Sequence, residues 1–266
     1  MDKCYKATDD VYVLPVNLPI PGLGFLPINA FVITGREPVL VDTGLGIFQR
    51  EFVTALESII DPKDLRWVWL THDDADHTGA IEEVMRIAPN AKLVTHAMSA
   101  MRMNTWWQVP LDRVHAIGPG QKLDIGDRTL VGVAPPVFDN PMSVGFYDDK
   151  SGILFSVDSF GALIDAPAEN ARDIPQDVLT QGMVAWATED SPWTNLVDEA
   201  KFGAVLEEVR RINPKMILSS HLPPAQNSTE QFLKVLATVP RAEHMPAPDQ
   251  AMFGQMVAQI TAPIAG

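Results

Sequence analysis

The sequence predicts an α/β protein in which two β-sheets face each other and helices cover both outer faces. Residues 1–103 read as strand, strand, helix, strand, helix, strand, helix, and residues 113–161 hold short strands separated by Gly, Asp and Lys turns. Longer helical patterns follow, with one more apolar strand between them. Each half supplies a sheet and then helices that must cover it. We therefore expect a four-layer αββα sandwich with mixed sheets, formed by residues 1–266 as one domain.

The elements of the first half follow from apolar patterning and from stop signals. A turn at Gly35 separates two apolar runs, and Pro62 and Pro89 follow segments with helical spacing. The predicted elements are strands at 29–34 and 38–44, a helix at 47–60, a strand at 66–72, a helix at 79–89, a strand at 91–96 and a helix at 97–103. Residues 11–35 are apolar but interrupted by four prolines, so they do not form a membrane span.

The second half is predicted from shorter patterns. Turn residues divide it into short strands, and helical spacing returns towards the C-terminus. The predicted elements are short strands within 113–136 and 142–161, helices near 174–187, 196–211 and 228–238, and a strand at 215–221. No repeat or clear linker interrupts the pattern, which favours one domain over two.

The composition favours a soluble, cytoplasmic protein that acts on a small molecule. Acidic residues outnumber basic ones by 34 to 20, and the formal net charge is −14. Such a charge argues against nucleic acid or an anionic membrane surface as the main partner. No positive segment leads into an apolar stretch at the N-terminus, so no signal peptide is expected, and Cys4 has no second cysteine to pair with. The apolar loops are compatible with a homodimer.

Residues 71–80 read THDDADHTGA and place two histidines and three aspartates close together directly after an apolar strand. His72, Asp74 and Asp76 alternate along the chain, so in an extended loop they point the same way. His77 follows and turns towards a neighbouring position, which lets one loop serve two adjacent metal ions. The plain alternative is a solvated acidic turn in which an aspartate caps the next helix.

Distant strands have to complete such a metal site. Asp158 ends the apolar strand ILFSVD, His221 follows the strand KMILSS, and Asp139 lies in FDNPMSVGF. Functional residues of α/β sheets gather beyond the carboxyl ends of strands. The acidic loop after one buried strand, together with Asp158 and His221 after two others, favours a metal site over a set of unrelated turn residues.

These blocks resemble the metallo-β-lactamase superfamily. THDDADH is similar to its His-x-His-x-Asp-His signature, with Asp74 in place of the second histidine, and VLVDTG resembles the strand and aspartate that precede it. DNPMSVGF resembles its His-Thr-Pro-Gly-Ser-Val-Gly-Phe segment, with Asp139 in place of the histidine. LFSVDSFG is similar to the segment with the bridging aspartate, here Asp158, and ILSSHLPP to the segment with the last histidine, here His221. The order of all five blocks implies the metallo-β-lactamase-like fold.

Within that superfamily the chain looks most like the lactamase-like domain of flavodiiron proteins, which have an acidic residue at the position of Asp74. The flavodoxin domain of those proteins is not expected here, because the chain ends soon after His221. The resemblance implies the following ligand set: His72, Asp74 and Asp139 for one ion, Asp76, His77 and His221 for the other, and Asp158 as the bridge.

A site of this composition needs cations. Two unit charges 4 Å apart repel by roughly 4 kcal/mol at an effective dielectric of 20, and four carboxylates would converge here. Two divalent ions would balance those four charges. Carboxylates favour hard ions, so iron or manganese is expected at least as readily as zinc.

The sequence leaves three functions open. The expected one is a binuclear metal-dependent hydrolase, in which a metal-bound water and Asp76 act on an ester, lactone, thioester or phosphodiester, since this needs no redox partner. The alternative is a non-haem diiron protein that binds or reduces O₂ or NO with an external electron donor. The third is a degenerate site, altered at Asp139, with a binding role. Iron content and oxygen uptake would indicate the diiron protein.

The candidate substrate contacts are His96, Trp106 and Trp107. The two tryptophans lie in an irregular stretch, and aromatic side chains in long connections can line a pocket. They can equally pack helices onto the sheet. His96 follows a predicted strand but stands outside the ligand pattern.

Overall fold

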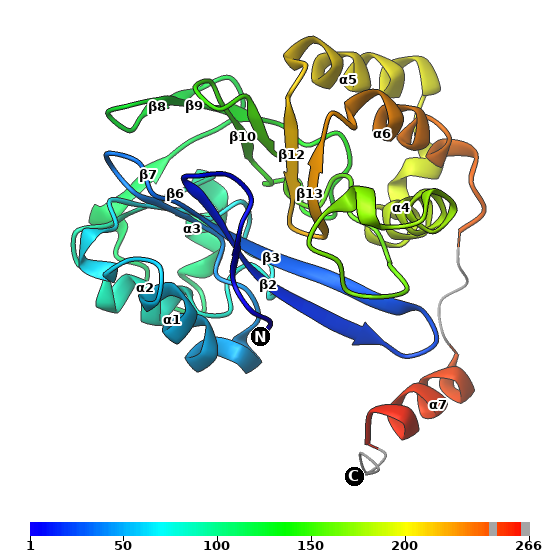
Figure 1. Ribbon diagram of the computed structural model, residues 1–266, viewed down its shortest axis with the longest axis horizontal. Helices are drawn as coiled ribbons and strands as arrows, with labels where there is room; N and C mark the ends of the chain where they lie inside the picture. Colours follow the sequence, from blue (N-terminus) through cyan, green and yellow to red (C-terminus); the bar gives the residue numbers. More distant parts are fainter. Residues whose placement is uncertain (245–248, 262–266) are drawn as a thin grey trace.

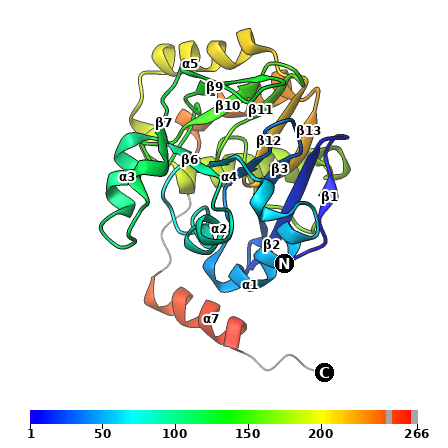
Figure 2. The same ribbon diagram turned by 90° about the vertical axis from the view of Figure 1, so that its left-hand side faces the viewer.

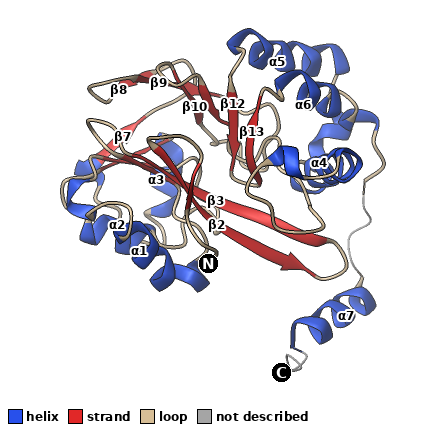
Figure 3. Cartoon of the chain, viewed as in Figure 1, coloured by secondary structure: helices blue, strands red, loops and turns tan. Residues whose placement is uncertain are grey.

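The computed structural model describes residues 1–244 and 249–261. Its first sheet has the strand order β1-β2-β3-β4-β5-β6-β7, with antiparallel pairs from β1 to β4 and parallel pairs from β4 to β7. Figure 3 shows the strands in red and the helices in blue. Its strands are β1 (Tyr5–Lys6), β2 (Val11–Ile20), β3 (Gly24–Ile33), β4 (Val39–Val41), β5 (Trp67–Trp69), β6 (Lys92–Thr95) and β7 (Val114–Ala116).

The second sheet has the order β13-β12-β11-β10-β9-β8 and is antiparallel except for the parallel pair of β11 and β12. Its strands are β8 (Lys122–Asp124), β9 (Thr129–Val133), β10 (Gly145–Asp148), β11 (Ile153–Phe155), β12 (Met216–Ser219) and β13 (Leu222–Gln226). Both sheets therefore mix parallel and antiparallel pairs, as predicted.

Helices cover the outer faces of the two sheets (Figures 1 and 2). The helices over the first sheet are α1 (Gln49–Glu57), α2 (Ile81–Ile87) and α3 (Ala97–Met103); those over the second are α4 (Gln176–Asp190), α5 (Glu199–Ile212) and α6 (Thr229–Leu236). A further helix, α7 (Gln250–Thr261), extends away from the layers. The predicted four-layer αββα architecture is confirmed. None of the helices in the described ranges is long and apolar enough to span a membrane.

Alternating side chains of the strands build three apolar layers. Leu40, Val68 and Leu93 point outwards and pack with the buried residues of α1 and α2. Their neighbours point inwards: the ring of Trp69 lies 4.5 Å from that of Phe146, centroid to centroid. Full burial of side chains of this size stabilises the fold by roughly 1.5–3 kcal/mol each. The layered packing fixes the two sheets against each other, and with them the loops at their shared edge.

The sequence pattern does not predict the hairpin of β2 and β3, apart from the strand at 29–34. Prolines argue against a strand interior because they cannot donate a ladder hydrogen bond. Here β1 pairs with β2 only at Tyr12 and Val13, and β4 pairs with β3 only at 31–33. Pro15, Pro19 and Pro27 lie beyond those short neighbours, where the outer side of the hairpin pairs with no other strand of the described residues. Helix α7 and strand β13, which contains two prolines, are likewise not predicted.

Candidate metal centre

The loop after β5 is fixed by its contacts with the loop after β4. The backbone N–H of Thr43 donates to the carbonyl of His77 at 2.8 Å, and that of Gly79 donates to the carbonyl of Gly44 at 2.7 Å. A Cβ at position 79 would lie 2.1 Å from the nitrogen of Gly46, so only glycine allows this approach. His77 lies in the turn before α2 and does not open the helix. The close contact of the two loops sets the position of its ring.

Asp158 follows a strained residue. Val157 has a φ of +58°, a left-handed conformation that is rare for a β-branched residue. Its carbonyl accepts hydrogen bonds from the N–H of Ser220 at 2.8 Å and the hydroxyl of Ser219 at 3.2 Å. Strain of this kind costs of order 1–3 kcal/mol and clusters at functional sites. Two bonds from the turn after β12 thus hold the chain where Asp158 enters the site.

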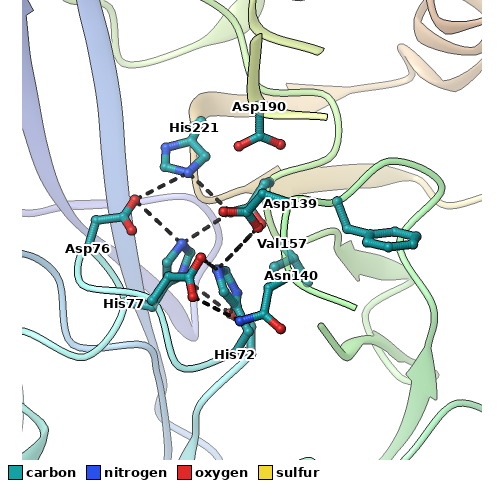
Figure 4. Close-up of polar contacts among 12 residues, drawn as sticks. His72, Asp76, His77, Asp139, Asn140, Val157, Asp190 and His221 are labelled. Carbon is teal, nitrogen blue, oxygen red and sulfur yellow. Dashed lines mark hydrogen bonds and ion pairs between the residues drawn. The ribbon is translucent and has the colours of Figure 1, made fainter. Parts of the chain in front are cut away.

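The seven predicted ligands converge from separate parts of the chain (Figure 4). In each of three groups the ligand atoms lie within 4.8 Å of one another. The groups are His72, Asp74 and Asp139; Asp76, His77 and His221; and His72, His77 and Asp158. The first two groups are the two ion sites that the resemblance implies. Their role as ligands remains a prediction, which the geometry supports.

Asp158 lies between these two groups. One carboxylate oxygen, Oδ1, is 3.1 Å from Nε2 of both His77 and His221. The other, Oδ2, is 3.7 Å from Nε2 of His72. The side chain is 2% exposed. This is the place that a bridging carboxylate would take.

Each histidine is oriented through its second ring nitrogen. Nδ1 of His221 lies 2.9 Å from the carbonyl oxygen of Pro27, which can only accept, so Nδ1 carries a proton. Nδ1 of His77 lies 2.9 Å from Oδ2 of Asp42 in the same way. In a neutral imidazole, Nε2 then presents a lone pair. Both lone pairs face the carboxylate of Asp158.

Two neutral imidazole Nε2 atoms facing the carboxylate of Asp158 repel it unless a positive charge lies between them. With neutral imidazoles, neither oxygen of Asp158 accepts a hydrogen bond from the described residues, although both oxygens are buried. An unpaired buried charge costs several kcal/mol. Metal cations at the Nε2 atoms would remove the cost, and protons on the rings would reduce it. The donor set therefore fits a pair of metal ions.

The electrostatics of the cation-free site show the same imbalance. Burial lowers the pKa of His77, but the carboxylates of Asp76, Asp42 and Asp158 outweigh it and raise the pKa well above its ordinary value. Burial and the nearby His77 lower the pKa of His72. Without metal, protons on some of the rings would have to serve as the missing cations.

The partly exposed carboxylates of Asp74 and Asp139 also have shifted pKa values. Burial, a hydrogen bond with Asp74 and the charge of Asp158 raise the pKa of Asp139 to about 8. The pKa of Asp74 is lowered: burial opposes this, but the hydrogen bond from Asp139 and the charge of His72 prevail. Without a cation in the first ion site, the two opposite shifts favour a proton on Asp139 and a charge on Asp74.

Two further aspartates belong to the surroundings. Asp42 follows β4, is buried, and accepts hydrogen bonds from the N–H and hydroxyl of Thr71 as well as facing His77. Asp190, at the end of α4, is half-buried, and Figure 4 shows its carboxylate turned towards the cluster. Burial and the charge of Asp158 raise the pKa of Asp190 to about 7. The motif containing Asp42 is visible in VLVDTG, whereas no sequence pattern indicates Asp190.

The three candidate substrate contacts occupy other positions. Nδ1 of His96 accepts the N–H of Met98 at 3.2 Å and caps α3. Trp107 packs against the apolar layer under α1 and α2. Residues 72–77, which carry four of the ligand candidates, form the ligand loop. Trp106 is 53% exposed and lines a cavity of about 840 Å³ beside this loop, and Asp73 lines the same cavity. Within the described part of the chain, the hydrogen bond of His96 and the ring contact between the two tryptophans involve no metal-ligand candidate, and the role of these residues in substrate binding remains a prediction.

The fold and the site define a class: a two-sheet α/β domain with a histidine and aspartate cluster that could hold metal ions. The family model described as ODP family beta lactamase matches residues 26–221. The chain belongs to this family, and its expected likeness to the lactamase-like domain of flavodiiron proteins is confirmed.

Individual relatives agree. An uncharacterized protein of Methanocaldococcus jannaschii is 25% identical over 193 residues, which cover 73% of this chain and 48% of that protein. The anaerobic nitric oxide reductase flavorubredoxin of Salmonella typhi is 34% identical over 134 residues, 50% of this chain and 28% of that protein. The structure of rubredoxin oxygen:oxidoreductase from Desulfovibrio gigas has a TM-score of 0.73 at 18% identity and covers 90% of this chain and 61% of that one. The chain thus spans about half or less of the curated relatives it matches.

The expectation of a metal-dependent hydrolase is wrong. The two relatives above whose names state an activity are reductases of nitric oxide or oxygen. The predicted acidic ligand set would give a physical reason, because anionic ligands lower the Lewis acidity that activates a metal-bound water. The catalytic role predicted for Asp76 beside a metal-bound water is therefore withdrawn together with the hydrolase. Asp76 still lies close to His77 and His221 as a candidate metal ligand.

Proposed function

We propose that this chain is a non-haem diiron protein that binds or reduces O₂ or NO with electrons from an external donor. Two facts support the proposal: the family and its oxidoreductase relatives, and the buried carboxylate of Asp158 facing the Nε2 atoms of His77 and His221. The geometry around Asp158 supports the binding of two metal ions, and the family relationship supports the reaction with O₂ or NO. Because the chain spans a fraction of those relatives, the donor is proposed as a separate protein or segment.

Iron fits the donor set better than zinc. Four carboxylates and three imidazoles offer more oxygen than nitrogen, and carboxylates favour hard ions. When bound, two iron ions would supply redox equivalents and open coordination positions for a diatomic ligand. We assign His72, Asp74 and Asp139 to one ion, Asp76, His77 and His221 to the other, and Asp158 to both.

The proposed metal centre has a buried side, formed by the histidines and Asp158, and a partly exposed side, formed by the other three carboxylates. The histidines and Asp158 are buried, and the bonds to Asp42 and Pro27 keep the Nε2 atoms of His77 and His221 aimed at the centre. The side chains of the other three carboxylates are 28–35% exposed. A small ligand would reach the centre from that side, past Asp139. The buried side excludes water and keeps the ligand geometry fixed.

Anaerobic loading with ferrous iron tests the proposal. We expect two irons per chain and an absorption change on addition of O₂ or NO, both lost in Asp158→Asn, with no turnover of an ester, lactone or phosphodiester panel. Tight retention of zinc in preference to iron, with no response to O₂ or NO, would contradict the proposal. Absence of any bound metal would leave the degenerate site.

A further inference from the structure

Asn140 connects the two segments that carry the first ion's ligands. It is 3% exposed and follows Asp139 directly. Its Nδ2 donates to Oδ1 of Asp74 at 2.8 Å and to Oδ1 of Asp73 at 3.1 Å. The amide thus uses both of its N–H groups on carboxylates of the ligand loop (Figure 4). Oδ2 of Asp74 takes no bond from this amide and lies 3.7 Å from Nε2 of His72.

The orientation of this amide is fixed by its oxygen. Oδ1 of Asn140 accepts the N–H of Met142 at 3.0 Å and a guanidinium N–H of Arg102 at 3.4 Å. A flipped amide would turn its NH₂ towards these donors and its oxygen towards the two carboxylates. Each hydrogen bond would become a repulsion. The side chain therefore has one stable orientation.

Asp73 and Arg102 bind the amide of Asn140 and each other. Oδ2 of Asp73 accepts from Nε of Arg102 at 3.0 Å, and Oδ1 accepts from the hydroxyl of Ser99 at 3.1 Å. The side chain of Asp73 is 4% exposed, so its charge is balanced by Arg102 and not by a metal. This explains why Asp73, alone among the aspartates of THDDADH, is absent from the groups that could hold an ion.

We propose that Asn140 is a positioning residue for the metal ligand Asp74, with Asp73 and Arg102 as its support. This inference rests on the proposed metal centre. By holding Oδ1 of Asp74, Asn140 leaves Oδ2 for the ion, and it ties the ligand loop to the segment of Asp139. Without it, Asp74 and Asp139 would be free to move apart. Partners of metal ligands of this kind typically contribute 10–100-fold in metal affinity.

The test compares iron binding by the wild type, Asn140→Leu and Thr229→Val. Thr229 is buried in α6 and donates to the carbonyl of Pro214, so Thr229→Val controls for the loss of a buried hydrogen bond away from the site. In chelator competition we expect Asn140→Leu to bind one ion about 10–100-fold more weakly and the other as the wild type does. Mössbauer spectra should change for one iron of the pair, and Thr229→Val should match the wild type.

Two unchanged affinities in Asn140→Leu would overturn the inference, as would equal weakening of both ions. If Asn140→Leu does not fold, Arg102→Gln serves instead, because Arg102 is half-exposed and acts only through Asp73 and Asn140. The same selective weakening, about 2–10-fold, is expected there, and no change would count against the inference. A wild type that binds no metal would contradict the proposed function itself, which distinguishes the two failures.

Discussion

Two acidic clusters in this molecule each contain a fully buried aspartate, and they differ in the partner that faces its negative charge. In the first, the guanidinium of Arg128, whose side chain is 1% exposed, pairs with Asp148 and Asp127 at 3.0 Å each and with Asp10. In the second, Asp158 is equally buried but faces only histidine nitrogens. The chain supplies a permanently charged arginine to the first cluster and only ionisable histidines to the second.

The difference separates a structural cluster from a functional one. The Arg128 cluster joins the turn before β9 to the end of β10 and to the N-terminal segment, and each of its carboxylates has a cationic partner within the chain. The cluster around Asp158 lies at the shared edge of both sheets, and its charges can be balanced only by protons on its histidines or by external cations. Buried ions that lack one partner are strongly destabilising. The four predictions below test this contrast, in order of expected effect.

Removing the cation of the structural cluster should have the largest effect. Arg128→Met leaves the fully buried Asp148 without a charged partner, although it keeps its hydrogen bonds from Ser151 and Lys150, and we expect a loss of about 3–5 kcal/mol in the free energy of unfolding. Urea denaturation measures it. Lys150→Met is the control, because Lys150 pairs with Asp127 at the surface and should contribute below about 1 kcal/mol. Equal effects of the two variants would remove the distinction between the buried and the exposed pair.

Removing the external cations should have the next largest effect. A ligand present at 100 times its Kd stabilises the folded state by about 2.7 kcal/mol. We therefore expect iron-loaded protein to unfold at higher temperature than chelator-treated protein. In Asp158→Asn this difference should vanish, whereas Arg128→Met should keep it. A thermal midpoint independent of metal in the wild type would refute the contrast.

Disturbing the orientation of one histidine should have a smaller effect. Asp42→Asn keeps the shape of the side chain but removes the charge that faces Nδ1 of His77 and accepts the bonds of Thr71. Partners of metal-bound histidines contribute about 10–100-fold in metal affinity. Isothermal titration with ferrous iron should show a loss of that size in Asp42→Asn. An unchanged affinity would show that the ring is held by packing alone.

The structural cluster should also give the protein acid sensitivity. Burial opposes ionisation of Asp127 and Asp10, but bonds to Lys150 and Arg128 outweigh it and hold both pKa values below their ordinary range. A carboxyl whose pKa is lower in the folded state adds stability above its unfolded pKa and loses it as the pH falls through the folded value. The free energy of unfolding of metal-free protein should therefore fall below about pH 4. Arg128→Met should weaken this dependence, and an identical pH profile would contradict the assignment.

The residues that could be predicted from the sequence are those that follow apolar strands. Asp158 and His221 stand at strand ends, and the spacing in THDDADH indicates the ligand loop. Asp42 appears in the VLVDTG motif, but its contact with His77 depends on the parallel pairing of β4 and β5. Asn140 and Asp190 carry no local signal, because their places depend on loop paths and on the packing of α4. The proline-containing β2 and β13 are not predicted for a related reason. The prolines of β2 lie beyond its short neighbour β1, and those of β13 lie in an edge strand where the register with β12 shifts, so tertiary structure makes them acceptable.

The metal content of the purified protein tests the central claim most directly. Protein produced in iron-supplemented medium and purified anaerobically should contain close to two irons per chain, and Asp158→Asn purified in parallel should contain almost none while keeping its folded secondary structure. Wild-type protein that is folded, stable and metal-free, with a thermal midpoint that iron does not change, would show that the carboxylates around Asp158 need no external cation and would contradict the account.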